Sequence, residues 1–210
     1  MACMRALSQT CAAMLAVSEA CERNKGPILA VLAEEFAAQH AVLEIGSGTG
    51  QHAVHFAMHL PHLTWLPSEV PSQLPPLIER IREEAPPNVR APIALDVRDD
   101  PWPVAHLDAV FSANSLHIMA WSAVREFFRG TGTLLRAGGV LCVYGPMRYR
   151  GEYTSASNAQ FDRWLKERDP QSGIRDFEAL DALALEQGLT LRADHAMPAN
   201  NQTLVWRRRG

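Results

Sequence analysis

Short apolar runs alternate along the chain with longer segments in which apolar residues recur every three or four positions. The short runs predict buried strands, and the longer segments predict amphipathic helices. Pro27 is expected in the first turn of the first helix, and Ser122 at the N-cap of a later one. Strands are predicted at 41–45, 63–66, 91–95, 109–113, 140–144, 189–195 and 203–206, and helices at 27–36, 53–60, 74–81, 122–135 and 176–187.

The order of these elements indicates an α/β fold. Strands that alternate with helices form a parallel sheet with helices on both faces. No helix separates the last two strands, so we expect them to pair as an antiparallel hairpin at one edge of a mostly parallel seven-stranded sheet. The segment 147–173 is rich in Ser, Asn and Arg, contains a predicted short helix near Trp164, and is expected to form a lid or binding loop.

The 210 residues fit one domain, which we place at 18–210 behind an N-terminal arm or helix at 1–17. The four cysteines lack the spacing of a disulfide framework or a zinc site, which favours a cytoplasmic protein. The sequence contains no apolar run of about 20 residues that could cross a membrane, and polar residues at 8–10 argue against a signal peptide.

The formal net charge of −3 argues against a nucleic-acid partner. His55 and His59 lie one helical turn apart without a third ligand, so no metal site is expected.

A glycine-rich loop, from Gly46 to Gly50, joins the first predicted strand to the following helix. Glycines there allow positive φ angles and let a ligand lie against the main chain, and free N–H groups at a helix start favour an anionic or hydrogen-bond-accepting group. A nicotinamide-dependent oxidoreductase needs Gly or Ala at position 51, where this chain has Gln51, and a Walker loop needs a Gly-Lys-Ser/Thr string. A tight turn without a ligand is the remaining alternative, although such turns seldom need three glycines.

Acidic residues stand at the ends of consecutive predicted strands: Glu44, Glu69 and Asp96. The carboxyl ends of parallel strands meet at the edge where open α/β sheets bind ligands. Glu69 lies 21 positions after Gly48 and can accept both hydroxyls of a ribose, and Asp96 can accept a hydrogen bond from an adenine amino group. The alternative for each acid is a solvated loop carboxylate.

The G-x-G-x-G spacing of Gly46, Gly48 and Gly50, two positions after Glu44, resembles the first motif of class I S-adenosylmethionine-dependent methyltransferases. Other strings resemble a small methyltransferase-like family known as domain of unknown function nine-three-eight. The resemblance covers the chain from about residue 18 to its end. The strings are ERNK (22–25), WLPSE (65–69), NSLHIMAW (114–121), YGP (144–146) and PANNQ (198–202).

This resemblance implies a single Rossmann-like methyltransferase domain that binds S-adenosylmethionine and releases S-adenosylhomocysteine. Glu69 stands where the family pattern leads us to expect Asp, which lengthens the ribose contact by one methylene. The residues then expected to bind the cofactor are Arg23, Glu44, Gly46, Ser47, Gly48, Gly50, Glu69, Asp96, Val97 and Asn114.

Candidates for the chemistry follow the fourth and fifth predicted strands. Asn114 is expected near the methionine part of the cofactor or the acceptor atom, and His117 is the candidate general base because imidazole titrates near neutrality. A packed or capping histidine is the alternative. Tyr144, Arg148 and Tyr149 are expected to bind the substrate, since arginines beside tyrosines suit an acidic or planar acceptor. The sequence thus predicts a methyltransferase for a small-molecule acceptor, or alternatively a module that binds the cofactor without transferring its methyl group.

Overall fold

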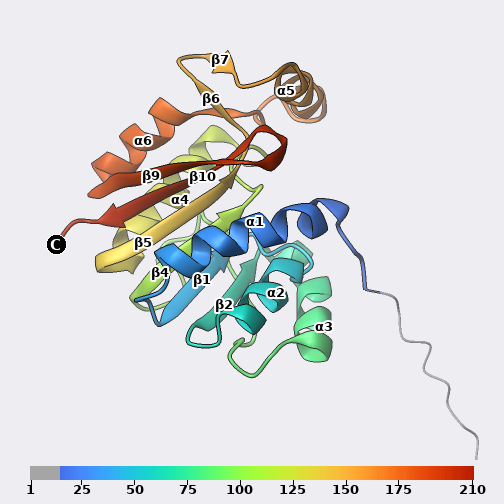
Figure 1. The fold of residues 1–210 in the computed structure, drawn as a ribbon, viewed down its shortest axis with the longest axis vertical. Helices are drawn as coiled ribbons and strands as arrows, with labels where there is room; N and C mark the ends of the chain where they lie inside the picture. Colours follow the sequence, from blue (N-terminus) through green and yellow to red (C-terminus); the bar gives the residue numbers. More distant parts are fainter. Residues whose placement is uncertain (1–14) are drawn as a thin grey trace, which may run out of the picture.

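The computed structural model describes residues 15–210, so most of the predicted N-terminal arm lies outside the described residues. Residues 15–18 precede the first helix without regular secondary structure. A seven-stranded sheet forms the centre, in the order β3-β2-β1-β4-β5-β10-β9 (Figure 1). Its strands are β1 (Ala41–Ile45), β2 (Thr64–Glu69), β3 (Ile93–Ala94), β4 (Leu107–Ala113), β5 (Leu135–Gly145), β9 (Leu189–Met197) and β10 (Asn201–Arg208).

The strand pairing confirms the predicted mostly parallel sheet. β1 pairs in parallel with β2 and β4, and β4 pairs in parallel with β5, so the carboxyl ends of these strands share one edge. β10 is antiparallel to both β5 and β9, as expected for the last two strands. β10 lies between its partners with the side chains of residues 203–206 buried, whereas β9 at the edge of the sheet exposes alternate residues.

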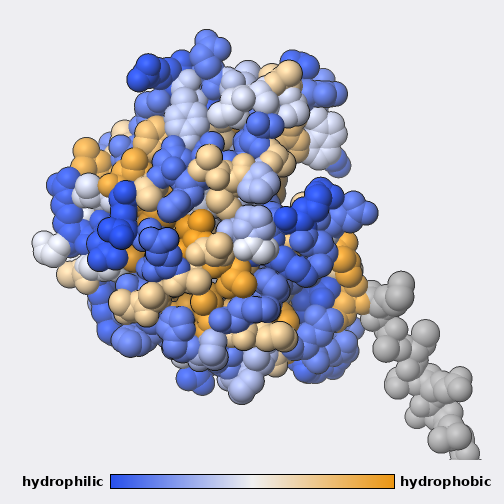
Figure 2. All heavy atoms as spheres, viewed as in Figure 1, coloured by the Kyte–Doolittle hydropathy of each residue, from blue (hydrophilic) through white to orange (hydrophobic). Residues whose placement is uncertain are grey.

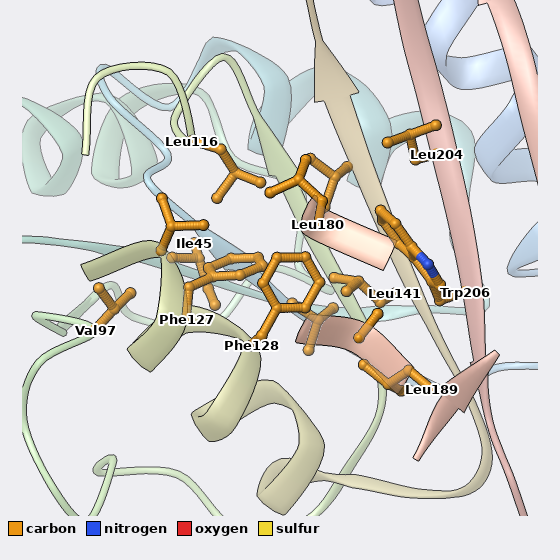
Figure 3. Packing of buried hydrophobic residues seen from close by; sticks show 14 of the residues in the cluster. Ile45, Val97, Leu116, Phe127, Phe128, Leu141, Leu180, Leu189, Leu204 and Trp206 are labelled. Carbon is orange, nitrogen blue, oxygen red and sulfur yellow. The ribbon is translucent and has the colours of Figure 1, made fainter. Parts of the chain in front are cut away.

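Helices cover both faces of the sheet, as predicted. On one face lie α1 (Glu19–Glu35), α2 (Gln51–His59) and α3 (Leu74–Glu84), and on the other α4 (Trp121–Leu134) and α6 (Phe177–Glu186) (Figure 1). Under α4, Phe128 packs edge to face against Phe127 and against Trp206 of β10 (Figure 3). Under α1 and α2, Phe56 and Phe111 make an edge-to-face pair. The sheet is therefore anchored by an aromatic cluster on each face.

The first helix begins eight residues earlier than predicted from Pro27. Ser18 is its N-cap and accepts a hydrogen bond from the Cys21 N–H, so Pro27 lies inside α1. An internal proline removes one helical hydrogen bond and typically costs about 3 kcal/mol. Ile28 and Leu32 on the same helix are fully buried against the sheet. Their packing keeps the helix continuous through the proline.

The boundary between α4 and β5 also differs from the prediction. α4 begins at Trp121 with Ala120 as N-cap, so Ser122 lies within the first turn rather than capping the helix. The helix passes directly into β5 at Leu135, and Gly138 adopts φ +79° within the strand. The pairing of β4 with β5 shifts register near this position, as it does at a β-bulge. The glycine pair at 138–139 therefore lies at a bend within β5, in the segment that the sequence left between a helix and a strand.

The predicted insertion forms a small layer of its own beyond the carboxyl end of β5 (Figure 1). Its three-stranded sheet has the order β7-β6-β8, and the predicted short helix is α5, a 13-residue helix. Asn158 of α5 donates a 2.9 Å hydrogen bond to the Asn200 carbonyl in the turn between β9 and β10. None of the helices within residues 15–210 is long and apolar enough to cross a membrane. The elements of the layer are β6 (Met147–Tyr149), β7 (Glu152–Tyr153), α5 (Ala156–Arg168) and β8 (Arg175–Asp176).

Candidate functional site

The glycine loop leaves β1 at Gly46 and enters α2 through Gly50. Gly46, Gly48 and Gly50 have φ angles of +75°, +55° and +84°, a region that costs a residue with a Cβ roughly 1–2 kcal/mol. A Cβ at Gly46 would lie 2.5 Å from Ser115 Oγ, and one at Gly50 would lie 2.8 Å from Leu77 Cδ1. Backbone conformation and lack of space therefore both require glycine at the two ends of the loop.

Glu69 lies directly against this loop. The Gly48 N–H donates to Glu69 Oε2 at 2.8 Å, and the Val70 N–H donates to Oε1 at 2.8 Å. A carboxylate offers about four acceptor directions, so two remain for a ligand. The parallel pairing of Ile45 with Ser68 places the strand ends side by side and brings Glu69 to the loop.

A cavity of about 230 Å³ opens between the loop and the ends of β2 and β3. Glu69 stands at the wall, while Val70, Val97 and Met119 supply apolar surface. This lining suits a ligand with a planar aromatic ring attached to a second ring that carries hydroxyl groups. The apolar side chains can pack on the faces of the aromatic ring, and the Glu69 carboxylate can accept hydrogen bonds from the hydroxyls of the second ring. The lining residues are Ile45, Gly46, Glu69, Val70, Leu95, Asp96, Val97, Arg98, Met119, Ala120, Ser122 and Ala123.

Asp96 lines the same cavity, but its carboxylate already has protein partners. Asp96 Oδ1 accepts hydrogen bonds from the Arg98 N–H at 3.0 Å and from Arg98 Nε at 2.9 Å, and Oδ2 accepts from the same guanidinium. The hydrogen bond from Arg98 lowers the pKa of Asp96. Asp96 is therefore ionised at neutral pH, and its contact with an adenine amino group stays a prediction.

Glu44 is not brought to the cavity. Because side chains alternate along β1, Glu44 points toward the face covered by α1 and α2, where Oε2 accepts a 2.8 Å hydrogen bond from Trp65 Nε1. Burial raises the pKa of Glu44 to about 7, and the charge of Glu69 adds to the rise. Glu44 thus packs beneath the start of the glycine loop, on the face of the sheet under α1 and α2, and does not line the cavity.

Asn114 and His117 lie close together at the carboxyl ends of β4 and β5. Asn114 has φ +56°, and its N–H donates to the Tyr144 carbonyl at 2.8 Å. A Cβ placed on Gly145 would lie 3.7 Å from His117 Nδ1 and 4.0 Å from Asn114 Oδ1, so both side chains face the same point above Gly145. The short β4–α4 connection that carries them also carries Ser115, which contacts Gly46. The two candidates for the chemistry are therefore adjacent to the glycine loop.

His117 is largely buried against the insertion. Its ring lies edge to face with Phe161 of α5 at a centroid distance of 5.3 Å. Burial lowers the pKa of His117 to about 4, and the charge of Arg175 contributes to the decrease. The imidazole is therefore neutral at pH 7, but it does not titrate near neutrality as the sequence predicted, because burial and the charge of Arg175 disfavour its protonated form and make it a weaker base than a free imidazole.

Arg148 and Tyr149 are occupied by contacts within the protein. Arg148 Nη2 donates to Asp176 Oδ2 at 2.6 Å, and the guanidinium lies over the Tyr153 ring. The Tyr149 hydroxyl donates to Asp194 Oδ2 at 2.6 Å. Arg148 therefore connects β6 with β7 and β8 inside the insertion, and Tyr149 connects the insertion to β9. The predicted role of both residues in substrate binding gains no support from these contacts.

Tyr144 differs from these two residues. Its ring packs in the cluster under α1, and its carbonyl accepts the Asn114 N–H. Burial raises the pKa of Tyr144. Of the three predicted substrate-binding residues, Tyr144 is thus the one placed at the carboxyl edge of the main sheet beside Asn114.

The sequence matches the family described as protein of unknown function (DUF938) over residues 15–208. This chain belongs to that family. The DUF938 chain also shares its fold with Rossmann-like methyltransferases of known structure. An O-methyltransferase family protein from Burkholderia thailandensis superposes with a TM-score of 0.77 at 18% identity, covering 91% of this chain and 58% of that one.

Two further structures show the same fold. The S-adenosylmethionine-dependent methyltransferase SibL gives a TM-score of 0.76 at 23% identity over 90% of this chain and 56% of SibL. Human N-acetylserotonin methyltransferase, solved with S-adenosylmethionine, gives a TM-score of 0.76 at 14% identity over 91% of this chain and 53% of its own. The DUF938 chain therefore spans little more than half the length of these three structural neighbours.

Two residues to which the sequence assigned no role in the site, Gln51 and Arg80, connect the N-terminal segment of the DUF938 protein to the glycine loop. Gln51 accepts a 2.6 Å hydrogen bond from the Ser18 N–H. The nearly buried Arg80 of α3 donates to the carbonyls of Thr49 and Ala16, both at 2.7 Å. The one available signal was Gln51 itself, which stands where a dinucleotide-binding loop has a small residue.

Arg23, predicted to bind the cofactor, does not line the cavity. Its side chain is 72% exposed and pairs with Glu19 at 3.4 Å, a surface ion pair that contributes little to stability.

Among residues 15–210, no three His, Cys, Asp or Glu side chains gather as a metal-ligand set. His59 Nδ1 instead hydrogen-bonds with the His55 carbonyl at 2.7 Å.

Proposed function

We propose that this DUF938 protein binds S-adenosylmethionine at the carboxyl edge of its sheet and transfers the methyl group to a hydroxyl of a small molecule, releasing S-adenosylhomocysteine. The observation that carries the proposal is the hydrogen bond between Gly48 and Glu69. This bond connects the glycine loop, whose backbone conformation requires glycine, to the Glu69 carboxylate. Glu69 can still accept hydrogen bonds from a ligand. A ribose with two neighbouring hydroxyls is the ligand group that such a pair fits.

The residues around the cavity fit the parts of the cofactor. The ribose would be held by Glu69, and the adenine would lie between Val70 and Val97 in the cavity. The amino-acid part would run past Gly46 toward Asn114, because Ser115, the residue after Asn114, already approaches Gly46 there. Ser47 and Gly48 do not line this cavity, and their N–H groups donate to the Ser68 carbonyl and to Glu69, so these two residues would support the cofactor site through Glu69 and β2.

The chemistry requires little from the protein beyond placement and a proton acceptor. When bound, S-adenosylmethionine supplies a methyl group on a positively charged sulfur, and the electron pair of the broken C–S bond stays on that sulfur. The acceptor oxygen forms the new C–O bond and loses its proton. His117 stands beside Asn114 with a neutral imidazole, and it accepts this proton on a ring nitrogen as the new C–O bond forms, because the methylated oxygen is then far more acidic than a buried imidazolium. Asn114 orients the hydroxyl with its side-chain amide.

The neighbours in fold support the same class of reaction. One belongs to an O-methyltransferase family, and another is a methyltransferase named for N-acetylserotonin, a small molecule. The net charge of −3 also favours a small molecule over a nucleic acid as acceptor.

Calorimetric titration with S-adenosylmethionine and with S-adenosylhomocysteine tests cofactor binding. Glu69→Ala should weaken both about 10- to 100-fold, the range expected for lost hydrogen bonds to a charged group. Glu126→Ala on the surface of α4 is the matched control, and Arg148→Ala should also leave the affinity unchanged. Equal losses in all three variants, or no binding by the wild type at millimolar ligand, would overturn the assignment.

Transfer is tested with labelled cofactor and a metabolite extract. A labelled small-molecule product supports the transferase. Tight binding of the cofactor with no label in any product identifies the protein as a binding module, the alternative function.

A further inference from the structure

A short segment of the insertion binds four consecutive carbonyls of the loop between β4 and α4. We refer to residues 171–175 as the clamp segment and to residues 114–120 as the β4–α4 loop. Each of the four carbonyls accepts a hydrogen bond from the clamp segment, the first three at 3.0, 2.8 and 2.9 Å. The carbonyls belong to Leu116, His117, Ile118 and Met119, and their donors are, in that order, Arg175 Nε, the Gly173 N–H, the Ser172 hydroxyl and Arg175 Nη2.

Arg175 binds the loop at two of these points with a single guanidinium. Its Nη2 also donates to the Gln171 carbonyl at 2.9 Å, so the same group joins the loop to the other end of the clamp segment. The acceptors of these hydrogen bonds are all main-chain carbonyls rather than carboxylates. Hydrogen bonds from an ionised donor are about twice as strong as neutral ones. The guanidinium lies 5.8 Å from the centre of the Trp121 ring at the start of α4, so its planar fork has a fixed orientation.

The clamp segment is itself fixed within the insertion. Arg175 begins β8, which pairs in parallel with β6 at Met147, just beyond the end of β5. The buried Ile174 donates its N–H to Asp162 Oδ1 of α5 at 2.7 Å. Gly173 has φ +145°, and a Cβ at this position would lie 2.9 Å from the same oxygen. A strand and a helix therefore hold the guanidinium in place.

The β4–α4 loop carries residues for both halves of the proposed reaction. Asn114 and His117 face the same point above Gly145, where the acceptor hydroxyl would lie. Met119 lines the cavity that would hold the cofactor. The clamp segment binds the main chain on both sides of His117 as well as at His117 itself. The place of the imidazole thus depends on the insertion.

The insertion also borders the open side of this region. The start of α1 and helix α5 face each other across the carboxyl edge of the sheet (Figure 1). Figure 2 shows that the molecular surface is hollowed between these two parts. Since α5 belongs to the insertion, the part of the chain that borders the hollow is also the part that holds the β4–α4 loop.

Satisfying the loop carbonyls does not by itself require an arginine. Neutral donors or water can bind such carbonyls, whereas a half-buried guanidinium loses part of its hydration and gains no carboxylate among these partners. A rigid fork adds a fixed position for the loop. Precision matters here, because a displacement of about 1 Å in a reacting group can lower a rate about 100-fold.

We propose that Arg175 is a positioning residue for methyl transfer, which holds the β4–α4 loop so that His117 meets the acceptor hydroxyl. Ser172 and Gly173 assist through their bonds to the neighbouring carbonyls. The hydroxyl proton still passes to a ring nitrogen of His117, and Arg175 takes no part in that transfer. This inference rests on the proposed function and adds to it the residue that places the proton acceptor.

The kinetic test uses the acceptor that the wild-type protein labels in a metabolite extract, after its purification. Arg175→Met keeps the aliphatic part of the side chain and removes every donor. It should lower kcat roughly 30-fold and leave the KM for the acceptor and the dissociation constant for S-adenosylhomocysteine within about threefold, because placement changes and binding contacts remain. Arg175→Lys keeps the charge without the fork and should recover part of kcat. Arg163→Met, on the exposed surface of α5, is the matched control and should behave as the wild type.

Folding is measured separately from catalysis. Circular dichroism identifies a temperature at which each variant is folded, and kcat is determined there. A residue that only stabilises the fold would lower the melting temperature and leave kcat unchanged, which would overturn the proposal. If Arg175→Met does not fold, Ser172→Ala removes one hydroxyl donor of the clamp segment and should still lower kcat about threefold.

Hydrogen exchange tests the clamp segment without cofactor or acceptor. In Arg175→Met, the amides of Ile118, Met119 and Gly173 should exchange faster than in the wild type, since the loop and the clamp segment separate more often. Arg163→Met should leave them unchanged. Full protection of these amides in Arg175→Met would mean that other contacts hold the loop, and would contradict the proposal.

A double-mutant cycle tests whether Arg175 acts through His117. In the His117→Ala background, Arg175→Met should lower the remaining kcat by no more than about threefold, because the group that Arg175 places is no longer there. The same loss in both backgrounds would show that Arg175 acts independently of His117.

The outcomes distinguish this inference from the proposed function. No labelled product with the wild-type protein would overturn the proposed function and this inference with it. A labelled product together with an unchanged kcat in folded Arg175→Met would overturn only the role of Arg175. A raised KM with unchanged kcat would assign Arg175 to acceptor binding instead, and a weakened affinity for S-adenosylhomocysteine would assign it to the cofactor.

Discussion

The cofactor region and the insertion are built in opposite ways. In the cofactor region, the backbone makes the site: a loop from Gly46 to Gly50 follows β1, and Glu69 reaches it from the adjacent strand. In the insertion, side chains make the structure: Asp162 on α5 accepts hydrogen bonds from Tyr153, Lys166 and the Ile174 N–H, at 2.6, 2.6 and 2.7 Å.

This difference explains why the two regions were predicted with unequal success. A loop in which every second residue has a left-handed backbone conformation requires glycines at fixed positions, and those glycines are visible in the sequence. The contacts of Arg148 and Tyr149 depend on Asp176 and Asp194, which lie far along the chain. The region whose site is made by the backbone is therefore the one that a sequence describes best.

The largest expected effect comes from the buried carboxylate of the insertion. Asp162→Asn should destabilise the insertion locally by about 3 kcal/mol, because it removes the buried charge to which Tyr153, Lys166 and the Ile174 N–H all donate. Hydrogen exchange should speed up for the amides of residues 152–176, while affinity for S-adenosylhomocysteine stays within about twofold. Glu167→Gln, on the exposed side of the same helix, is the control. Loss of cofactor affinity in Asp162→Asn would show that the two regions are not independent.

In the cofactor region, the decisive change is Gly46→Ala. The new Cβ must adopt φ +75° and would meet Ser115 Oγ at 2.5 Å, so the loop cannot keep its shape. Calorimetry should show an affinity for S-adenosylhomocysteine about 100-fold lower, equivalent to roughly 2.7 kcal/mol.

Gly138→Ala is the matched control for this change. Gly138 has φ +79° and nothing within 4 Å of its Cβ position, so this variant has the same backbone strain far from the loop. It should lower the free energy of unfolding by about 1 kcal/mol and leave cofactor affinity unchanged. If both variants lost the same affinity, the loss would come from backbone strain in general and not from a change in the shape of the glycine loop.

The last comparison concerns pH, and its effect has opposite signs in the two regions. Burial raises the pKa of Glu44 from 4.5 to about 7, so the folded state binds an extra proton between these values, and the stability that this proton contributes is lost as the pH rises from 4.5 to 7. Glu44→Gln keeps an oxygen for Trp65 and cannot ionise. Its free energy of unfolding should exceed that of the wild type by about 3 kcal/mol at pH 8 and match it near pH 4, as chemical denaturation can measure.

Asp162 provides the opposite case. Burial opposes its ionisation, but hydrogen bonds from Lys166 and Tyr153 lower its pKa, so its contribution is present above pH 3.8 and is lost as the pH falls. Hydrogen exchange in the insertion should therefore increase on acidification, while Glu44 makes the central sheet less stable on alkalinisation. A shared pH dependence in both regions would contradict this separation.

Local patterns in the sequence determine much of this protein. The period of the apolar residues predicted nearly all strands of the main sheet, and the spacing from Gly48 to Glu69 predicted the meeting of loop and carboxylate. Both follow from short-range rules: side chains alternate along a strand, and parallel strands end at a common edge. The continuation of α1 through Pro27 was missed because buried contacts of Ile28 and Leu32 outweigh a local preference.

Only the tertiary structure decided which side chains meet. Gln51 binds Ser18, and Arg80 joins Ala16 to Thr49, although these residues lie far apart in the sequence. Residue type limits the backbone angles that one position can adopt, and that information is local. The partner of a flexible polar side chain is selected by the packing of whole helices and strands, which depends on the entire sequence at once.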